Sequence, residues 1–574
     1  MNRQFGFVGL IFYGVCACSS LNSNGGPRTD ADPSTPDSPA VSDDFPNAFR
    51  TFYVSPGGND VADGLSEGHA WATVARVNAA ALQPGDAVLF QRGGEWREAL
   101  IASASGTDAQ PIGFGAYGTG AKPKLWGSDL LDASHFAPAD HGVFQMAAPP
   151  TINCVVVDHA FLVAAPGAVM TTPGSYEVTG GMLRINPGAF DPRSDGRTYG
   201  ICVRDDLVST HAQSHLRIRN LVTDESAKFD AGYGVRVMNS EDVQVTDCEA
   251  YRAGKHHFGV INSTGFIGTN LYAAYALPGQ GAGGASAFVS FGDGTGPFTG
   301  QTAEWHACTF EHAEDLASPG TNYYAFITHG AALASLLVDG MISRGGNLLI
   351  SNSDNTAETI AVRGGWINDA RLEVEGSGTL IDGIRITGPG GSVDLVGSNI
   401  VVQNAVITGA NPQAAWFQTA VASRGMNNTV RLSTIVMDPA AASYDTCLAL
   451  VNAGTAFHYY GNILWSPRRV LKQWAGSPDH DDIADAGYNL VSPAATFNDP
   501  DMALTAWQHV GLDVTTKAAQ PGFMNVTTGD YSLAAGSPAL DEAVLPPGVM
   551  VPTDFAGRPR PVGAGYDSGA FERQ

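Results

Sequence analysis

The sequence predicts an all-β protein built as a right-handed parallel β-helix, because strand-like segments recur at a fixed interval through its middle. One series of segments begins at Gly234, Phe258, Ala287, Ala325, Leu348 and Arg371, and a second interleaves with it. Where no insertion intervenes, both recur about every 23 to 24 residues, which is a solenoid period. Each segment is a short run of Val, Ile, Leu and Phe bounded by Gly, Asn, Asp or Ser, as expected of strands separated by turns.

The alternatives to a β-helix fit less well. No helical period separates the strands, and the fixed Leu and Asn spacing of leucine-rich repeats is missing. We expect residues 216–411 to form successive coils with right-handed crossovers. Equivalent residues of successive coils should stack about 4.8 Å apart. The alignment of the segments predicts two structural ladders, one of Asn262, Ser290, Thr328 and Ser351, the other of Cys248, Leu271 and Cys308.

Composition agrees with this fold and excludes one class of partner. The chain of 574 residues contains 69 Gly, and 15% of its residues are charged, whereas roughly 25% is usual. Such a balance suits many strands and tight turns around a core distributed along a solenoid. The net charge of −25 leaves no basic stripe for nucleic acid. No cofactor is required by any pattern, and Ca²⁺ is the one metal left open, since a polyanionic substrate would need local cations or a bound metal.

The first 18 residues predict a cleaved export signal. Arg3 precedes an apolar run over residues 5–15, and small residues follow, as in export signals. The run is too short to span a bilayer. The residues Val15-Cys16-Ala17-Cys18 resemble the lipobox of bacterial lipoproteins, which implies a lipid on Cys18, and Ser19 favours the outer membrane. An ordinary secretory signal is the alternative, and it would also place the protein outside the cytoplasm.

The rest of the chain divides by composition and pattern. Residues 19–47 are polar and predict a disordered tether. An N-terminal cap and the first coils follow over 48–140, then an inserted β-rich module over 141–200, the β-helix body over 201–515 and a closing segment over 516–574. Within the cap, residues 70–81 predict a short amphipathic helix that plugs the end of the solenoid. Cys154 and Cys202 flank the module and are candidates for a disulfide after export.

Segments at both ends of the chain carry a family resemblance: residues 52–60, 71–73, 82–90 and 93–97 at the opening, and 536–541, 554–560 and 565–572 in the closing segment. They resemble the corresponding segments of the pectate-lyase-like β-helix proteins. That superfamily includes polysaccharide lyases, several families of glycoside hydrolases and many members without known activity. The resemblance implies the fold and a polysaccharide substrate, but neither end carries a reacting group, so the chemistry must be argued from the site.

No GxSxG elbow, HExxH motif or glycine-rich phosphate loop is present, so candidate residues come from clusters. The densest cluster is the turn Tyr251-Arg252-Ala253-Gly254-Lys255-His256-His257, which leads into a strand ending at Asn262. A polysaccharide lyase must neutralise a uronate carboxylate and remove the neighbouring proton. We expect Lys255 to neutralise and His257 to act as the base, because imidazole is a neutral acceptor near pH 7. His256 is a further catalytic candidate, and Tyr251, Arg252 and Asn262 are expected to bind substrate in the same outer groove.

A second cluster lies two coils further on, about 10 Å away at the spacing of stacked strands. It contains Tyr323, Tyr324, His329, Arg344, Asn347 and Asn352. His329 and Arg344 are its catalytic candidates, and Tyr324, Asn347 and Asn352 are expected to bind substrate. The spacing suits neighbouring sugar subsites along a groove.

Three functions remain open at this stage. The crowding of titratable side chains in three coils favours an enzyme, foremost a polysaccharide lyase that cleaves a uronic-acid-containing glycan by β-elimination. Glycoside hydrolysis is the rival, and it requires two carboxylates roughly 5 to 9.5 Å apart, for which the candidates are Glu249, Asp293, Glu311 and Asp315. A non-catalytic glycan-binding or adhesin-like surface protein is the third. We expect a monomer whose partners are a polysaccharide and the membrane that holds its lipid.

Overall fold

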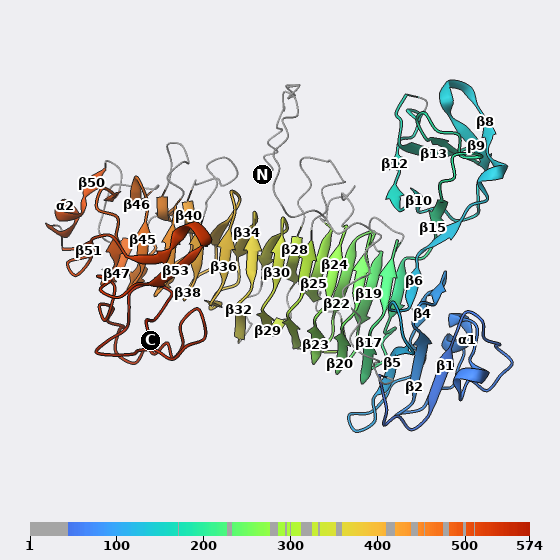
Figure 1. The fold of residues 1–574 in the computed structure, drawn as a ribbon, viewed down its shortest axis with the longest axis horizontal. Coiled ribbons are helices and arrows are strands. Elements are labelled where there is room, and N and C mark those ends of the chain that lie inside the picture. The colour runs from blue at the N-terminus through green and yellow to red at the C-terminus, as the bar shows by residue number, and fades with distance from the viewer. Residues whose placement is uncertain are drawn as a thin grey trace, which may run out of the picture. The chain divides into compact units, whose positions relative to one another are not determined.

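A computed structural model describes residues 44–574 apart from 170, 227–231, 276–284, 293–295, 299, 312–323, 331–332, 352–358, 409–418, 438–445, 453, 474–481, 498–500 and 510. It confirms the right-handed parallel β-helix (Figure 1). Within the described residues, three 14-stranded sheets form the sides of the coils. We call them sheets A, B and C in the order in which the chain visits them. No helix among the described residues has both the length and the apolar character that crossing a membrane requires.

The strands of the three sheets have the following bounds. Sheet A contains β1 (Thr51–Val54), β2 (Ala87–Gln91), β5 (Ile112–Tyr117), β17 (Leu216–Arg219), β20 (Val243–Thr246), β23 (Phe266–Thr269), β26 (Gln301–His306), β29 (Leu333–Asp339), β32 (Thr359–Arg363), β35 (Leu380–Asp382), β38 (Val401–Gln403), β41 (Thr429–Arg431), β44 (Phe457–Tyr460) and β47 (Ile483–Gly487). Sheet B contains β3 (Glu95–Trp96), β6 (Lys124–Trp126), β18 (Val222–Asp224), β21 (Glu249–Tyr251), β24 (Tyr272–Ala274), β27 (Thr309–Glu311), β30 (Ile342–Arg344), β33 (Trp366–Asn368), β36 (Arg385–Thr387), β39 (Val406–Thr408), β42 (Thr434–Val436), β45 (Ile463–Trp465), β48 (Leu490–Val491) and β51 (Lys517–Ala518). Sheet C contains β4 (Leu100–Ile101), β16 (Asp206–Ser209), β19 (Tyr233–Met238), β22 (His256–Ile261), β25 (Ser286–Gly292), β28 (Tyr324–Gly330), β31 (Asn347–Ile350), β34 (Arg371–Val374), β37 (Ser392–Leu395), β40 (Thr419–Ser423), β43 (Thr446–Leu450), β46 (Arg469–Gln473), β49 (Thr496–Phe497) and β50 (Met502–Ala503).

The chain turns from sheet A to sheet B in the same way in every coil from β17 to β48. Two residues connect the strands, and the first of them has a positive φ, as in Asn220 at 55° and Asn270 at 51°. Asn and Gly tolerate this left-handed conformation best. The second residue points into the core, and it is Cys248, Leu271 or Cys308 in three successive coils. The predicted ladder of these three residues is therefore present.

The other predicted ladder is out of register. Ser290 pairs with Thr328 as expected, but their partners in the neighbouring strands are Val260 and Ile350. Asn262 instead lies in the turn after β22, with a φ of 48°, and its side-chain oxygen accepts a hydrogen bond from the Gln301 amide at 3.2 Å. The error arose because the turn after each sheet C strand varies in length, so alignment of the strand ends does not give the register.

Each end of the solenoid is closed by its own segment. At the start, α1 (Val74–Asn78) follows η1 (Glu67–His69), and Val74 and Val77 are buried. The helix is shorter than the predicted 70–81, because Asp60 accepts hydrogen bonds from the backbone N–H groups of Ala72 and Thr73 and holds them extended. At the other end, α2 (Leu504–His509) is the last helix before the closing segment. The closing segment contains β52 (Phe523–Asn525), η5 (Val526–Thr528) and β53 (Asp530–Leu533).

A separate pair of sheets lies between β6 and β16. Its strands are β7 (Ser128–Leu130), β8 (Ala137–Pro138), β9 (Phe144–Ala147), β10 (Cys154–Val157), β11 (Ala160–Phe161), β12 (Val163–Ala164), β13 (Ser175–Thr179), β14 (Met182–Asn186) and β15 (Tyr199–Cys202), with η2 (Ala133–His135) and η3 (Asp140–Gly142) between them. Cys154 and Cys202 face each other on β10 and β15 and form a disulfide, with their Cα atoms 5.1 Å apart. This module has its own apolar core.

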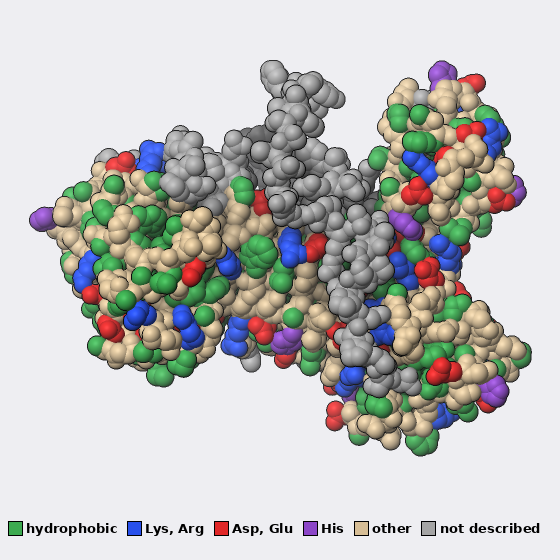
Figure 2. Space-filling model, viewed as in Figure 1, with side chains coloured by type: hydrophobic (Ala, Val, Ile, Leu, Met, Phe, Trp, Pro, Cys, Tyr) green, Lys and Arg blue, Asp and Glu red, His purple; other side chains and the backbone are tan. Residues whose placement is uncertain are grey.

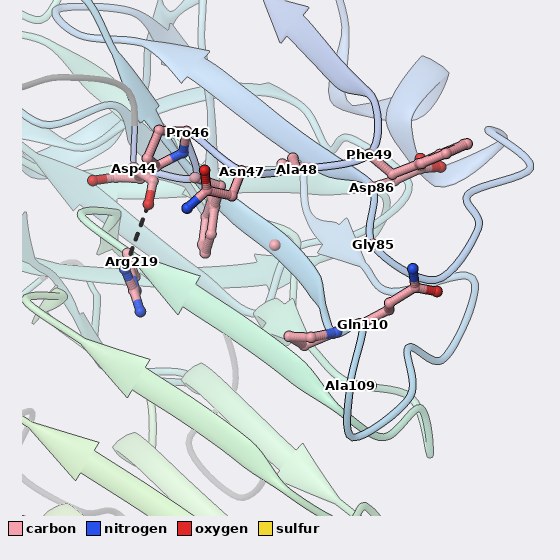
Figure 3. Close-up of a pocket in the computed structure, with 14 residues that line it drawn as sticks. Asp44, Pro46, Asn47, Ala48, Phe49, Gly85, Asp86, Ala109, Gln110 and Arg219 are labelled. Carbon is pink, nitrogen blue, oxygen red and sulfur yellow. Dashed lines mark hydrogen bonds between the residues drawn. The ribbon is translucent and has the colours of Figure 1, made fainter.

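The segment that precedes β1 lies against sheet A. Figure 3 shows Asp44, whose backbone oxygen accepts a hydrogen bond from Arg219 at 3.4 Å. Its carboxylate accepts further bonds from the Ala116 N–H and the Asn220 amide, each at 2.7 Å. The Phe45 ring packs so closely on Gly113 that a Cβ atom there would lie 2.8 Å from it. A pocket of about 400 Å³ lies beside this segment, and among the described residues no strand of sheet C lines it.

The core of the β-helix is a set of stacked apolar ladders. In sheet C, Phe258, Phe288 and Phe326 occupy equivalent positions on successive strands, and all are almost fully buried. Phe258 and Phe288 are stacked at 5.5 Å between ring centroids, and Trp305 contacts Phe288 and Phe326 edge-on at 5.5 and 5.7 Å. Stacking of like residues at strand spacing thus fills this part of the interior with aromatic rings in contact.

His257 belongs to this interior and not to an outer groove. Its ring is 1% exposed, and its Nε2 lies 2.8 Å from the Ala274 carbonyl oxygen. Burial lowers the pKa of His257 to about 4, because charging an imidazole away from water is unfavourable. The expectation that this ring faces an outer groove is therefore wrong.

Removing one ring of the aromatic stack should cost much of the stability of these coils. We expect Phe288→Ala to lower the free energy of unfolding by about 3–5 kcal/mol, because it removes buried surface and leaves a cavity. Urea unfolding followed by intrinsic fluorescence measures the loss. Thr309→Ala, a half-buried outward position on sheet B, is the matched control and should change stability by less than about 0.5 kcal/mol. Equal stability of the two variants would contradict this packing.

The buried His257 should make the protein sensitive to mild acid. The unfolded imidazole takes up a proton below its ordinary pKa of 6.5, whereas the folded one does so only near 4. The free energy of unfolding should thus fall by as much as about 3 kcal/mol as pH drops through this window, at about 1.4 kcal/mol per pKa unit. His257→Gln, whose amide can still donate to Ala274, should lose that part of the pH dependence. His69→Gln, at an exposed position, should keep it, and identical urea midpoints against pH for His257→Gln and the parent would refute the assignment.

Candidate functional site

Sheet C is the side of the β-helix whose surroundings vary. The connections from sheet A to sheet B are two residues long throughout the body, whereas every long connection adjoins a strand of sheet C. Residues 275–285 and 312–323 lead into β25 and β28, and residues 409–418 and 437–445 lead into β40 and β43. Loops positioned by a rigid scaffold commonly carry function. The outer face of sheet C is therefore the place to look for a site.

Between these long connections lie three coils in which the connection from sheet B to sheet C is short. Only residues 345–346 precede β31, only 369–370 precede β34, and 388–391 precede β37. The outward side chains of these three strands are thus bordered by insertions on both sides along the helix axis. The short connections leave the middle of sheet C with the least chain at this corner.

Strands β34 and β37 alternate apolar residues that point inward with polar or charged residues that point outward. Leu372 and Val374 point into the core from β34, as do Val393 and Leu395 from β37. Side chains alternate along a strand, so Arg371 and Glu373 point outward from β34 and Asp394 points outward from β37. Glu373 and Asp394 are direct partners in the parallel ladder.

Two arginines flank this carboxylate pair. Arg371 contacts the Glu373 carboxylate at 2.5 Å, and its backbone N–H donates to the Asn347 side-chain oxygen at 2.9 Å. Arg424, which follows β40, donates to the Asp394 carboxylate. The turn that carries Arg424 is pressed onto the preceding coil: a Cβ atom on Gly425 would lie 1.9 Å from the Gly397 carbonyl oxygen. Glycine at this position lets the guanidinium reach Asp394.

The two carboxylates differ in environment. The Glu373 side chain is 18% exposed and the Asp394 side chain is 6% exposed. Burial raises the pKa of Asp394, Arg424 opposes the rise, and the negative charge of Glu373 adds to it. The Asp394 Oδ1 atom is buried without a hydrogen-bond partner among the described residues. A carboxyl group of this kind holds its proton to a higher pH than an exposed aspartate does.

Tyr324 adjoins the same group of charges. It occupies the row of outward residues that continues through Asn347 and Arg371, and burial together with Glu373 raises the pKa of its hydroxyl. The site on sheet C therefore comprises Tyr324, Asn347, Arg371, Glu373, Asp394 and Arg424, which we call the carboxylate site. Asp394, whose pKa is raised, and the charge-paired Glu373 beside it can supply an acid and a nucleophile or base to one bond.

The histidine-rich turn predicted from the sequence does not form a comparable site. Lys255 is half-buried just before β22, and His256 is 5% exposed, with its Nδ1 2.6 Å from the Ser286 hydroxyl. His257 lies in the core, and Asn262 serves the turn described above. Lys255 and His257 are close in sequence, but the structure places the imidazole on the far side of the sheet from any substrate.

The aromatic and basic residues at the start of that turn face sheet B and are paired there. Arg252 binds the fully buried Asp224 carboxylate through two hydrogen bonds, at 2.9 and 2.6 Å. Tyr251 donates to Glu249 at 2.7 Å. The Arg252 pair joins neighbouring coils of sheet B and the Tyr251 bond lies within β21, so both residues have a structural partner where a substrate contact was expected.

The second predicted cluster divides between two sheets. Tyr324 and Asn347 lie on sheet C in the carboxylate site, as part of the expected substrate-binding set. Arg344 lies on sheet B, is exposed, and pairs with Glu311. Tyr323 and Asn352 lie outside the described residues, as do Cys18 and the carboxylates Asp293 and Asp315, and the same holds for the side chain of His329.

The carboxylates Glu249 and Glu311 face outward from sheet B but are not neighbours. Their strands β21 and β27 are separated by β24. Lys122 and Tyr251 hold Glu249, and although burial raises its pKa, these partners lower it overall. Tyr272 donates to Glu311 at 2.8 Å. In Figure 2 the acidic and basic side chains of the visible face adjoin one another and gather into no large patch of one sign, in keeping with such pairing.

Sequence reasoning missed Arg371, Glu373, Asp394 and Arg424. The signal was present, since Glu373 and Asp394 are each the third residue of a strand segment, in Arg371-Leu372-Glu373-Val374 and Ser392-Val393-Asp394-Leu395. Alignment of one more repeat would have stacked them. Among the described residues no three or more His, Cys, Asp or Glu side chains are grouped so as to share a metal ion.

Comparisons with known proteins identify the fold. No protein-family model matches the chain, and no curated protein sequence matches it. A solved structure described as XylC in complex with xylose shares 11% identity over 91% of this chain and 98% of its own, with a TM-score of 0.54. A glycoside hydrolase is similar at 9% identity over 81% and 99%, with a TM-score of 0.37, and pectate lyase Pel9A at 11% over 92% and 97%, with a TM-score of 0.33. At these identities the likeness is one of fold alone, and the right-handed parallel β-helix is seen directly in the three stacked sheets.

Proposed function

We propose that this protein is a polysaccharide-degrading enzyme that hydrolyses glycosidic bonds at the carboxylate site. One observation carries the proposal: Glu373 and Asp394 occupy equivalent outward positions on adjacent strands, and the pKa of Asp394 is raised by its surroundings. Glycoside hydrolysis needs two carboxyl groups, one protonated and one ionised, on either side of the scissile bond. That the fold is shared with a protein whose structure contains xylose supports a sugar as the ligand.

The proposed roles follow from the two environments. Asp394 donates its proton to the glycosidic oxygen as the bond from that oxygen to the anomeric carbon breaks. Glu373, which pairs with Arg371 at 2.5 Å, attacks the anomeric carbon and forms a glycosyl ester. Asp394 then takes a proton from water, which attacks the same carbon and releases Glu373. Each group ends the cycle in its starting protonation state.

The spacing of the pair favours retention of the anomeric configuration. Paired strands are about 4.8 Å apart, and the carboxyl groups of retaining enzymes are about 5–5.5 Å apart, whereas inverting enzymes need a wider gap for water. Tyr324 and Asn347 border the pair and are proposed to bind the sugar next to the scissile bond.

The β-elimination predicted from the sequence is the less favoured reaction. Its base was placed at His257, which is buried in the core and cannot touch a sugar outside the sheet. A lyase also needs a cation for the uronate carboxylate, and both arginines of the carboxylate site are already paired with carboxylates. Formation of an unsaturated product would nevertheless distinguish the two reactions directly.

The catalytic pair is tested by separate replacement of its members. Asp394→Asn and Glu373→Gln should each lower kcat on a polysaccharide by a factor of about 100 to 10,000, the usual contribution of such groups. Asp394→Asn should keep the glycosylation of an aryl glycoside, whose leaving group needs no proton, whereas Glu373→Gln should lose it. Reducing ends and ultraviolet absorbance are followed together on neutral and uronic-acid polysaccharides, and the product anomer is read by NMR.

Two controls accompany these variants. Glu304→Gln, at an exposed carboxylate of sheet A, should leave kcat unchanged. Arg424→Gln removes a charge that lowers the pKa of Asp394, so the alkaline limb of kcat/KM should move to higher pH. Unsaturated product from uronic-acid polysaccharides, with no new reducing ends from neutral ones, would establish a lyase. Near-parental activity of both Asp394→Asn and Glu373→Gln would show that this site is not the catalytic one.

We also propose that the enzyme is exported and held at the outer membrane by a lipid on Cys18, on the evidence of the lipobox-like residues Val15-Cys16-Ala17-Cys18. Cys18→Ala should abolish incorporation of labelled fatty acid and move the protein from the membrane fraction to the soluble one. Cys16→Ala is the matched control and should keep the label. Labelling of Cys18→Ala would show that the lipid, if any, is attached elsewhere.

A further inference from the structure

A pocket of about 660 Å³ lies on sheet B near the end of the solenoid. Thr408, Val436 and Trp465 line one side of it, and these residues end the successive strands β39, β42 and β45. The closing segment provides the other side, through Gln520, Phe523 and Tyr531. The volume falls in the range of small-ligand sites, about 300–1,000 Å³.

The pocket exists because the closing segment covers one outward row of sheet B and leaves the next. Val406 packs with Tyr531 and Ala570, and Ile463 packs with Leu533 and Ala539. Those contacts bury the first outward residue of each strand. Thr408, Val436 and Trp465, two residues further along each strand, remain beside the closing segment as one wall of the pocket. Figure 1 shows β53 beside β45.

The lining has three aromatic rings and no charged side chain. Phe523 and Tyr531 meet edge to face at 5.3 Å, and Trp465 faces them from sheet B and is half-exposed. Burial raises the pKa of Tyr531, so its hydroxyl stays neutral. The charge of Arg385 acts on Tyr531 from outside the lining, but the lining itself offers a charged ligand no counter-charge. An uncharged ring could stack on the indole.

Polar groups are nevertheless available at the pocket. Gln520 is exposed, and within the described part of the chain neither its amide nor the Trp465 indole N–H has a hydrogen-bond partner. An apolar ligand would leave both groups unused. A ligand with an apolar face and several hydroxyl groups would use the rings and the donors together, and pyranose rings have this chemistry.

We propose that this pocket binds neutral sugar residues of a polysaccharide, as a non-catalytic subsite. Asp394 lies on β37, and Trp465 lies three coils later, about 14 Å further along the axis at strand spacing. The pocket is on sheet B and the carboxylate site is on sheet C, so the pocket holds the polymer away from the bond that is cleaved. Only the identity of the polymer rests on the proposed function; the binding itself does not.

The test measures binding in Asp394→Asn, so that hydrolysis does not interfere. Oligosaccharides of glucose, xylose, mannose and galactose, and of uronic acids for contrast, are titrated while tryptophan fluorescence and calorimetry are followed. Trp465→Ala should raise the Kd of the neutral ligand at least tenfold, since stacking on an indole is lost. Gln520→Ala, at an exposed position that folding does not depend on, should raise it severalfold.

Trp366→Ala is the matched control, because Trp366 is also half-exposed on sheet B but does not line the pocket. It should leave the Kd unchanged. Circular dichroism verifies that each variant is folded. Equal Kd values for the parent, Trp465→Ala and Gln520→Ala would overturn the proposal, as would Trp465-dependent binding of uronates or of a long-chain detergent in place of neutral sugars. Sugar binding with this dependence, together with an unsubstituted protein that hydrolyses none of these sugars, would uphold the subsite and refute the catalytic role of Asp394.

Discussion

The register of the parallel ladders is the constraint on which the other features depend. Every residue of a coil lies about 4.8 Å from its equivalents in the coils before and after it, so the choice of side chain at one position is felt by its neighbours. Apolar positions become continuous ladders such as Phe258, Phe288 and Phe326. The same rule puts outward residues into rows, and a row that contains two acids must bring them together.

That rule explains why the carboxylate site is costly to stability and suited to chemistry. Like charges directly opposite each other on adjacent strands destabilise a sheet, and Glu373 beside Asp394 is such a pair. Arg371 and Arg424 offset the cost by pairing with one carboxylate each. Compensation is incomplete at Asp394, where burial still raises the pKa. Perturbed groups that the fold itself does not need are commonly those used in function.

The fold could be predicted because the repeat is visible in the sequences of the strand segments. The site could not, because its contacts depend on the register of the strands and on which side of the sheet each side chain points to. The turn from sheet A to sheet B is uniform, and its ladder of Cys248, Leu271 and Cys308 followed from alignment. The prediction that His257 faces an outer groove failed for a local reason. At the equivalent corner Ala287 and Phe288 are both in the core, as are Ala325 and Phe326, so alternation breaks at the start of these strands. His257 precedes Phe258 at that same corner and turns inward, which no period-2 pattern indicates.

Clustering in sequence was also a misleading guide to the chemistry. Tyr251, Arg252 and His257 are close along the chain, yet the first two serve pairs on sheet B and the third fills the core. Glu373 and Asp394 are one coil apart in sequence and adjacent in space. In a solenoid, residues separated by one repeat are nearer partners than many that are separated by a few positions. The short connections before β31, β34 and β37 then matter as much as the side chains, because insertions at this corner would cover the row where Glu373 and Asp394 meet. The turns from sheet A to sheet B are uniform from β17 to β48, so the variation in connection length falls at the edges of sheet C, where the carboxylate site lies.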